Sequence, residues 1–254
     1  GQGHSYTGAV ARSTTTEAVV LRSFRLGEAD RVLHVYTLDR GRVGAVAKGV
    51  RKTMSRFGGR LEPFSHVELV LHHGRGELET VTGASLVRSH DRIRSDPYRL
   101  QVGLIGLEAM IRLFTEQEGN ERAFLALTRF LDALDEAPSQ STRPSLDPRV
   151  LSLQLKLLWV SGYMPHLGSC VECGAGEGLV AFAPAAGGVV CRDCDRGGIP
   201  IGIESLTGIS TLVRTPIADA PAAGLREGAR RDTLAVLTGS YEHHGGFRLR
   251  TART

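Results

Sequence analysis

Apolar and polar residues alternate in five short segments among the first ninety positions of the chain. These segments are residues 17–24, 31–38, 42–50, 64–72 and 78–87. Alternation with a period of two is typical of β-strands with one buried face, and turn-forming sequences such as Gly27–Asp30 and His73–Gly76 separate the segments. Short strands at this regular spacing predict a small antiparallel barrel, for which an OB-fold is the natural candidate. An SH3-like barrel or an open meander would have the same periodicity.

The pattern changes to helical spacing after Asp96 and Pro97. Apolar residues then recur every three or four positions over residues 100–114 and 124–134. A Pro-, Ser- and Thr-rich link precedes a further helix that begins at Asp147 and Pro148, because a carboxylate caps a helix N-terminus and proline fits its first turn. Residues 204–214 and 226–243 also have helical spacing.

This change of pattern predicts an α+β chain with two domains. A five-stranded OB-fold-like barrel spans residues 17–90, and a helical domain follows over residues 91–254. Residues 1–16 are rich in Gly, Ser and Thr and lack the apolar stretch of a signal peptide, so we expect a tag remnant or a disordered arm. No apolar run approaches the roughly 18 residues of a membrane-spanning helix, and we expect a cytoplasmic protein.

The four cysteines form two CxxC pairs, Cys170 with Cys173 and Cys191 with Cys194, separated by 17 residues. Such a spacing is typical of a zinc site, because each CxxC turn directs both thiolates the same way and two turns complete a tetrahedron. We therefore predict one structural Zn²⁺ in a module over about residues 168–198, inserted into the helical domain. An iron–sulfur cluster and a redox disulfide are the alternatives for these residues.

Catalytic motifs are missing from the sequence. Four thiolates close the coordination shell of zinc, whereas a catalytic zinc keeps one position open. His66 and Glu68 offer the H-x-E half of a zinc deaminase signature, but they lie in a predicted strand roughly a hundred residues upstream, and no proline precedes either CxxC. We assign His66 to the barrel. The chain has no Walker A motif, no GxGxxG and no GxSxG, so we expect a binding protein rather than an enzyme.

The net charge of +4 is distributed unevenly along the chain. Residues 101–145 carry more carboxylates than cations, whereas residues 40–60 carry no carboxylate. The cations of the basic stretch are Arg40, Arg42, Lys48, Arg51, Lys52, Arg56 and Arg60. A basic region beside an acidic one predicts a polyanion-binding barrel joined to a part with a different role.

Most of these cations lie in one connection between two predicted strands. Lysine and arginine there can neutralise phosphates, and the glycines allow the backbone to approach a ligand closely. Phe57 lies in the same connection and has two possible roles. Its ring could stack on an unpaired base, or it could pack the loop against the barrel.

Together these features resemble the RecO family of bacterial recombination mediators. The run EAVVLRSFRLGEADRVLHVYTLDRGRVGAVAKGVRKTMSRFGGRLEPFSHVEL is similar to the N-terminal barrel of that family. The resemblance continues to a four-cysteine insertion between LWVSGYMPHLGSC and CRDC and covers Glu17 to His243. The preference for arginine over lysine suggests a high-GC, actinobacterial source.

The resemblance implies a nonenzymatic role in DNA repair and recombination. RecO proteins bind single- and double-stranded DNA, anneal complementary strands, and help to load RecA at gaps with RecR and the single-strand-binding protein. It implies a nucleoid-associated protein whose zinc is structural and whose helical domain contacts the single-strand-binding protein. The implied DNA contacts include Lys48, Arg51, Lys52, Arg56 and Arg60, with Arg40 and Arg42 nearby, and Phe57 in the same connection is a further candidate.

Two other functions are compatible with the residues. The zinc and helical regions could form a protein-interaction adaptor, with the barrel as its scaffold. A zinc hydrolase or deaminase would require an open metal site.

Overall fold

The computed structural model describes residues 13–49, 57–115, 117–140 and 142–252. The chain divides into two compact units. One consists of Gly1–Ser89 with Glu116–Asn120, and the other of His90–Thr115 with Glu121–Thr254. Each unit has its own core and is described by itself.

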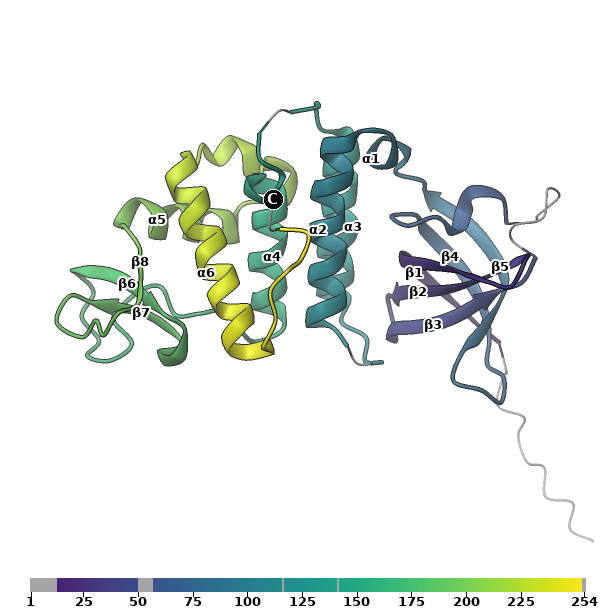
Figure 1. The fold of residues 1–254 in the computed structure, drawn as a ribbon, viewed down its shortest axis with the longest axis horizontal. Coiled ribbons are helices and arrows are strands. Elements are labelled where there is room, and N and C mark those ends of the chain that lie inside the picture. The colour runs from purple at the N-terminus through teal and green to yellow at the C-terminus, as the bar shows by residue number, and fades with distance from the viewer. Residues whose placement is uncertain (1–12, 50–56, 116, 141, 253–254) are drawn as a thin grey trace, which may run out of the picture. The chain divides into compact units, whose positions relative to one another are not determined.

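The first unit is a closed five-stranded barrel. Its strands are β1 (Ser13–Leu26), β2 (Asp30–Thr37), β3 (Gly41–Ala47), β4 (His66–His72) and β5 (Glu79–Arg88). Around the barrel they follow the order β1-β2-β3-β5-β4 (Figure 1). A short 3₁₀-helix, η1 (Gly58–Leu61), lies in the connection between β3 and β4. The predicted five-stranded OB-fold-like barrel is thus confirmed.

The strand pairing differs from the prediction in one respect, since the neighbours are not all antiparallel. β3 and β5 pair in parallel, with Ala45 opposite Glu79 and Val46 opposite Thr80. The physical reason is the odd number of strands. When five strands alternate in direction and then close into a ring, two strands of the same direction must meet.

The expectation of a disordered arm over residues 1–16 is wrong for its last four residues. Ser13 to Thr16 begin β1 and pair with β4, from Ser13 opposite His72 to Thr16 opposite Leu69. Three of these residues are threonines, whose branched side chains favour a pleated strand. β1 is largely exposed at this end, so its residues there are polar and do not alternate with apolar ones. The search for alternating apolar residues therefore missed this part of the strand. The residues before Ser13 lie outside the described part of the chain.

The barrel core consists of the inward-facing residues of all five strands. The alternation predicted from the sequence is visible in β3, where Val43, Ala45 and Ala47 are buried between less buried neighbours. Thirteen residues form one buried cluster, which also includes Phe57 and Leu61 from the connection before β4. Residues removed from water in this way provide the main driving force for folding.

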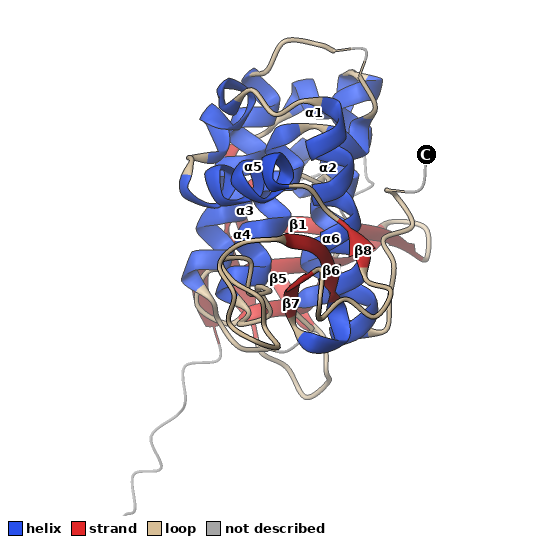
Figure 2. Ribbon diagram, turned by 90° about the vertical axis from the view of Figure 1, so that its left-hand side faces the viewer, coloured by secondary structure: helices blue, strands red, loops and turns tan. Residues whose placement is uncertain are grey.

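The second unit is helical. Its helices are α1 (Asp91–Ser95), α2 (Pro97–Leu113), α3 (Glu121–Glu136), α4 (Pro148–Val160), α5 (Ile203–Arg214) and α6 (Glu227–Gly245), with 3₁₀-helices η2 (Pro144–Leu146), η3 (Pro184–Ala186) and η4 (Ile217–Ala223) (Figure 2). Asp96 caps α2 by accepting a hydrogen bond from the Arg99 N–H. Asp147 caps α4 at the predicted start by accepting from the Arg149 N–H at 2.8 Å. No helix in the described ranges is both long and apolar enough to cross a membrane.

Close packing fixes the helices of this unit. Gly106 on α2 faces the ring of Phe130 on α3, so a side chain at position 106 would collide with that ring. Tyr241 on α6 donates a hydrogen bond of 3.0 Å to the side-chain oxygen of Gln154 on α4. Both contacts are buried; the first joins consecutive helices, and the second joins helices that are distant in the sequence.

A small sheet is inserted between α4 and α5. It has three strands in the order β7-β6-β8, where β6 is Leu179–Ala183, β7 is Gly188–Cys191 and β8 is Ile199–Pro200. The sheet packs on α6 where Gly239 leaves room for Pro184, Phe182 and Ile199. Cys191 is the last residue of β7, and Cys170, Cys173 and Cys194 lie in the loops before β6 and after β7.

Candidate metal centre and nucleic-acid interface

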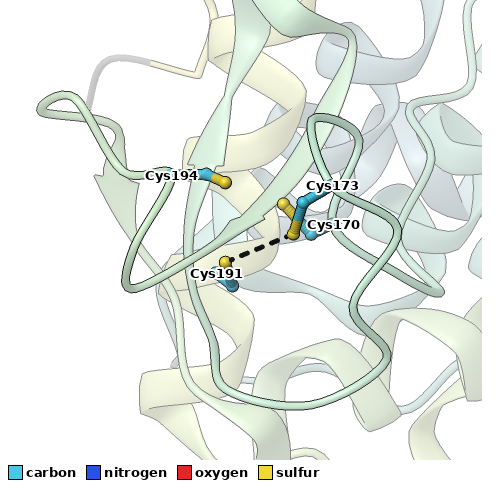
Figure 3. A group of neighbouring side chains, drawn as sticks. All are labelled: Cys170, Cys173, Cys191 and Cys194. Carbon is cyan, nitrogen blue, oxygen red and sulfur yellow. Dashed lines mark hydrogen bonds between the residues drawn. The ribbon is translucent and has the colours of Figure 1, made fainter.

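The four cysteine sulfurs converge on one point of the inserted sheet (Figure 3). All four Sγ atoms lie within 4.8 Å of one another, and those of Cys173 and Cys191 are 3.7 Å apart. A tetrahedron of thiolates around zinc, with Zn–S bonds of about 2.3 Å, requires sulfurs about 3.8 Å apart. A disulfide would need about 2.05 Å. The predicted cluster of Cys170, Cys173, Cys191 and Cys194 therefore has dimensions that suit a metal ion.

Backbone turns direct each pair of thiolates to this point. In the first CxxC, the Gly174 N–H donates to the Cys170 carbonyl and the Cys170 N–H donates to the Ala175 carbonyl, both at 2.8 Å. Gly174 has a φ of +80°, which a side chain would disfavour. In the second CxxC, the Cys194 and Asp195 N–H groups both donate to the Cys191 carbonyl.

The electrostatics of the cluster favour a bound cation. Backbone N–H groups of Cys173 and Cys191 lower the pKa of the Cys170 thiol to about 6. Hydrogen bonds with the sulfurs of Cys191 and Cys173 raise the pKa of the Cys194 thiol to about 12, because they favour its protonated form, and the charge of Cys170 adds to the effect. A divalent metal removes this conflict, since it stabilises all four thiolates at once.

His66 does not belong to this cluster. It lies in β4 of the barrel, where its Nε2 is 2.7 Å from a carboxylate oxygen of Glu17. The group of clustered metal-ligating atoms found among the described residues consists of the four cysteines. Around a metal ion, four thiolates would form the closed coordination shell that is typical of a structural site.

The basic connection after β3 is anchored to the barrel at both ends. At its start, the Gly49 N–H donates a hydrogen bond of 2.8 Å to the side chain of Asp30 in the β1–β2 hairpin, next to the exposed Lys48. At its end, Phe57 and Leu61 are buried in the core cluster of the barrel, and Arg60 donates a hydrogen bond of 3.2 Å to the Phe57 carbonyl. The predicted contacts Arg51, Lys52 and Arg56 lie outside the described residues.

Phe57 is part of the barrel core. Its side chain is 1% exposed and belongs to the buried cluster of the barrel. The ring has no accessible face, so the hypothesis that Phe57 stacks on bases is wrong for this conformation. Of its two possible roles, the structure supports the packing of the loop against the barrel.

Arg40 is paired with a carboxylate that lies far away in the sequence. Its guanidinium makes two hydrogen bonds to the buried Glu79 on β5, of 2.6 and 3.1 Å. These bonds raise the pKa of Arg40. Glu79 therefore compensates the charge of Arg40, which makes Arg40 a weaker phosphate ligand than its place in the basic stretch suggested.

Three further candidates that the sequence did not reveal, Arg22, Phe24 and His34, lie near the predicted Arg42 on the outer surface of β1, β2 and β3. Arg22 lies opposite His34 in the β1–β2 pair, and Phe24 lies opposite Val32. The Phe24 and His34 rings contact each other edge to face, with centroids 5.4 Å apart. Burial lowers the pKa of His34, and Arg42 of β3 and Arg22 are close enough to lower it further. We call Arg22, Phe24, His34 and Arg42 the cationic face.

A β-bulge explains why sequence periodicity missed this face. Ala18 and Val20 point into the core, so strict alternation would also direct residues 22 and 24 inward. The register shifts between Val20 and Arg22, and one extra residue reverses the side on which the following residues lie. The one signal in the sequence was the charged Arg22, at a position that strict alternation would place in the core.

The helical unit contains a pocket of about 490 Å³ with an apolar wall and a basic rim. Trp159 at the end of α4 lines it with 61% of its surface exposed. The other lining residues are Arg122, Ala126, Arg129, Lys156, Val160, Val213, Arg214, Thr215, Pro216 and Ile217. Arginines around an apolar surface suit an acidic ligand that also carries apolar side chains.

Comparison with known proteins covers both units. The family model for Recombination protein O N terminal matches residues 12–90, and that for Recombination protein O C terminal matches residues 94–253. The DNA repair protein RecO of Rubrobacter xylanophilus is 41% identical over 224 residues, which are 85% of this chain and 87% of that protein. The protein of the same name from Anaeromyxobacter sp. strain K is 34% identical over 241 residues, 92% of each chain. That from Frankia casuarinae is 39% identical over 235 residues, 90% of this chain and 92% of that protein.

Proposed function

Because this chain belongs to the RecO family of DNA repair proteins, we propose that it acts as a nonenzymatic recombination mediator. In this role it binds single- and double-stranded DNA, anneals complementary strands and helps RecR to load RecA at gaps. The match of both family regions, in order and over almost the whole chain, is the observation that carries the proposal. We place the protein in the cytoplasm, associated with the nucleoid.

The barrel is the proposed DNA-binding unit. The basic connection begins beside Lys48, and its flanking residues are anchored by Asp30 and by the buried Phe57. Arg42, Lys48, Arg51, Lys52, Arg56 and Arg60 are the proposed phosphate contacts, and Arg40 contributes less because Glu79 binds it.

Reversal of three charges tests this proposal. We expect Arg51→Glu, Lys52→Glu and Arg56→Glu together to weaken binding to an oligothymidylate and to reduce its salt slope by about 2, at about 0.7 per lost single-strand contact. A triple reversal of Arg226, Arg230 and Arg231 in the helical unit changes the net charge equally and is the matched control. Equal affinity and slope in the loop variant and the parent would refute the loop assignment.

We further propose that the cysteine cluster holds one structural Zn²⁺. The four converging thiolates and the distances between them support this assignment. The metal would stabilise the inserted sheet rather than activate a substrate, because four protein ligands leave no position for water. Metal analysis of the purified protein should find one zinc per chain.

The pocket of the helical unit is the proposed site for the acidic tail of the single-strand-binding protein. Its apolar wall at Trp159 and its arginines Arg129 and Arg214 provide both parts of the recognition that such a tail requires. We expect Trp159→Ala to weaken binding of a fluorescent tail peptide at least tenfold, because exposed aromatic anchors dominate such interfaces. Trp159→Phe keeps an aromatic surface and should retain most of the affinity.

An adaptor that uses only its helical and zinc regions is the second candidate. The pocket is the observation that favours it. An adaptor would bind the tail peptide tightly while its DNA binding would be weak and insensitive to salt. A DNA titration at two salt concentrations separates the two functions.

A further inference from the structure

The four cysteines of the cluster are not equally shielded from water. Cys170 and Cys191 are buried, Cys194 is partly buried, and Cys173 is exposed. Cys191 is the last residue of β7, where it pairs with Leu179 of β6 and is held in the sheet. Cys173 lies in the loop before β6, outside the sheet. A small molecule that arrives from solvent therefore meets Cys173 before the other three.

The loop around Cys173 is open on its outer side. Every residue from position 172 to 178 is exposed. Within the described part of the chain, no atom beyond the chain neighbours lies within 4 Å of the place that a Cβ of Gly174, Gly176 or Gly178 would take. Glycines in open space can change their backbone angles at little steric cost. The loop can therefore both admit a reactant to Cys173 and shift its position.

Cys191 is a near neighbour of the exposed cysteine. The Sγ atoms of Cys173 and Cys191 are 3.7 Å apart, although 18 positions separate the two residues in the sequence (Figure 3). A disulfide needs about 2.05 Å, so the two sulfurs must approach each other by roughly 1.7 Å. The ladder holds Cys191, and the glycine-rich loop gives Cys173 the freedom to make this movement.

The proposed zinc site makes Cys173 reactive as well as accessible. The thiolate is the form of cysteine that oxidants attack, and a cysteine that binds a metal is deprotonated. Susceptibility to oxidation follows thiolate character and exposure, and redox-sensitive cysteines often lie beside a second cysteine. Cys173 combines these features, because it is a member of the cluster, is exposed and has Cys191 beside it.

We propose that Cys173 is a modification site for hydrogen peroxide, and that its oxidation releases the metal and opens the cysteine module. This inference rests on the proposed zinc site and adds a regulatory property to it. The Cys173 thiolate attacks one peroxide oxygen, so that an S–O bond forms, the O–O bond breaks and hydroxide leaves. The Cys191 thiolate then attacks the Cys173 sulfur, so that the S–S bond forms, the S–O bond breaks and a second hydroxide leaves. Two protons from solvent convert both hydroxides into water, and the two electrons lost by the sulfurs reduce the peroxide.

Formation of this disulfide removes the support of the module. Cys170 and Cys194 are the two remaining ligands, which are too few for a structural zinc site. The buried cluster of the module has four members, and Cys170 and Cys191 are two of them, so little apolar core is left to hold the sheet. Phe182 of β6 is 1% exposed and packs on α6 at Gly239. Opening of the module therefore uncovers a buried ring and the face of α6 beneath it.

Zinc release from the full chain tests the proposal. The zinc-containing protein is treated with hydrogen peroxide while a colorimetric chelator records the metal that leaves. We expect zinc release to keep pace with formation of the first disulfide, and peptide mass spectrometry to identify that disulfide as Cys173 with Cys191. Hydrogen exchange should show lost protection of β6 and of α6 around Gly239. Dithiothreitol followed by zinc should restore both the metal content and the protection.

Two histidine variants separate the exposed position from the partly buried one. Cys173→His and Cys194→His each keep four ligands of types that zinc accepts, and metal analysis before the addition of peroxide checks that both hold zinc. Cys173→His lacks the exposed thiolate, and we expect it to release zinc about tenfold more slowly than the parent. Cys194→His keeps Cys173 and Cys191 and is the matched control. Its rate of release should be within about twofold of the parental rate.

The outcomes distinguish this proposal from the zinc site on which it rests. Equal rates of release in Cys173→His and the parent would overturn the proposal and leave the zinc site in place. A first disulfide without Cys173, or zinc retained after the disulfide has formed, would do the same. A parent that contains no zinc before peroxide is added would overturn the proposed zinc site, and this inference with it.

Discussion

The barrel and the cysteine module of this protein are held together by different forces. The barrel has a buried cluster of thirteen side chains, drawn from all five strands and the connection before β4. In the module, four residues form the buried cluster, and two of them are Cys170 and Cys191. A core of that size cannot offset the conformational entropy lost on folding, so small modules of this kind depend on a bound metal.

The barrel and the cysteine module also differ in the charged groups that they bring close together. On the outer surface of the barrel, Arg22 lies close enough to Arg42 to lower its pKa in addition to the effect of burial. The module instead gathers thiolates that need a cation to coexist. On our proposals, one region thus offers a site to an external anion, whereas the other holds an internal cation.

Loss of the metal should have the largest effect and should be confined to the module. Cys173→Ser removes one of four ligands, and we expect zinc occupancy to fall and the sheet of β6, β7 and β8 to unfold, at a cost on the order of 10 kcal/mol. Hydrogen exchange followed by mass spectrometry would show lost protection in that sheet and unchanged protection in the barrel. Ser169→Ala, beside the first ligand, serves as the control. A Cys173→Ser variant with full zinc content and parental protection would contradict the assignment.

A large-to-small substitution in the barrel core should destabilise the barrel and leave the cysteine module unaffected. Phe57→Ala is expected to destabilise the barrel by about 3–5 kcal/mol, because it removes a buried ring, and to leave zinc content unchanged. Phe24→Ala deletes the same ring from an exposed position and should cost less than about 1 kcal/mol. Thermal melts with metal analysis compare the two. Weaker DNA binding by a Phe57→Ala protein of parental stability would show that Phe57 contacts DNA after all.

A third type of support is a half-buried cation that binds the end of a helix, and Lys156 provides it. Its ammonium donates to the carbonyls of Leu212, Val213 and Thr215 at 2.8 to 3.0 Å, at the C-terminus of α5. Lys156→Met keeps the apolar stem but leaves these carbonyls without their donor, and we expect a loss of about 2 kcal/mol in the helical unit. The barrel and the zinc content should not change. Lys156→Arg, which keeps the charge, should lose less stability.

The smallest expected effect concerns the pH dependence of the barrel. The pKa of His34 is lowered by burial and by Arg42 and Arg22, which face it from β3 and β1 with Gly44 and Phe24. The unfolded chain therefore binds a proton near pH 6.5 more readily than the folded chain does, and stability decreases as the pH falls through that value. In His34→Gln this part of the pH dependence should disappear. Melting temperatures at pH 7.5 and 5.5 measure the difference, and equal slopes in parent and variant would contradict it.

Local patterns in the sequence determined much of this protein by themselves. Alternating apolar residues predicted five strands, Asp147 with Pro148 predicted the start of α4, and the two CxxC pairs predicted a cluster of four sulfurs. These features depend on residues close together in the chain, so periodicity and spacing record them.

Other features depended on contacts that only the tertiary structure brings together. Barrel closure places Glu79 against Arg40, although the basic stretch itself holds no carboxylate. Packing against the barrel buries Phe57, whose type alone was compatible with stacking on a base. The bulge after Val20 turns Phe24 and Arg22 outward, against the alternation that precedes it. In each case the deciding interaction joins residues far apart in sequence or depends on strand register, and neither composition nor periodicity encodes it.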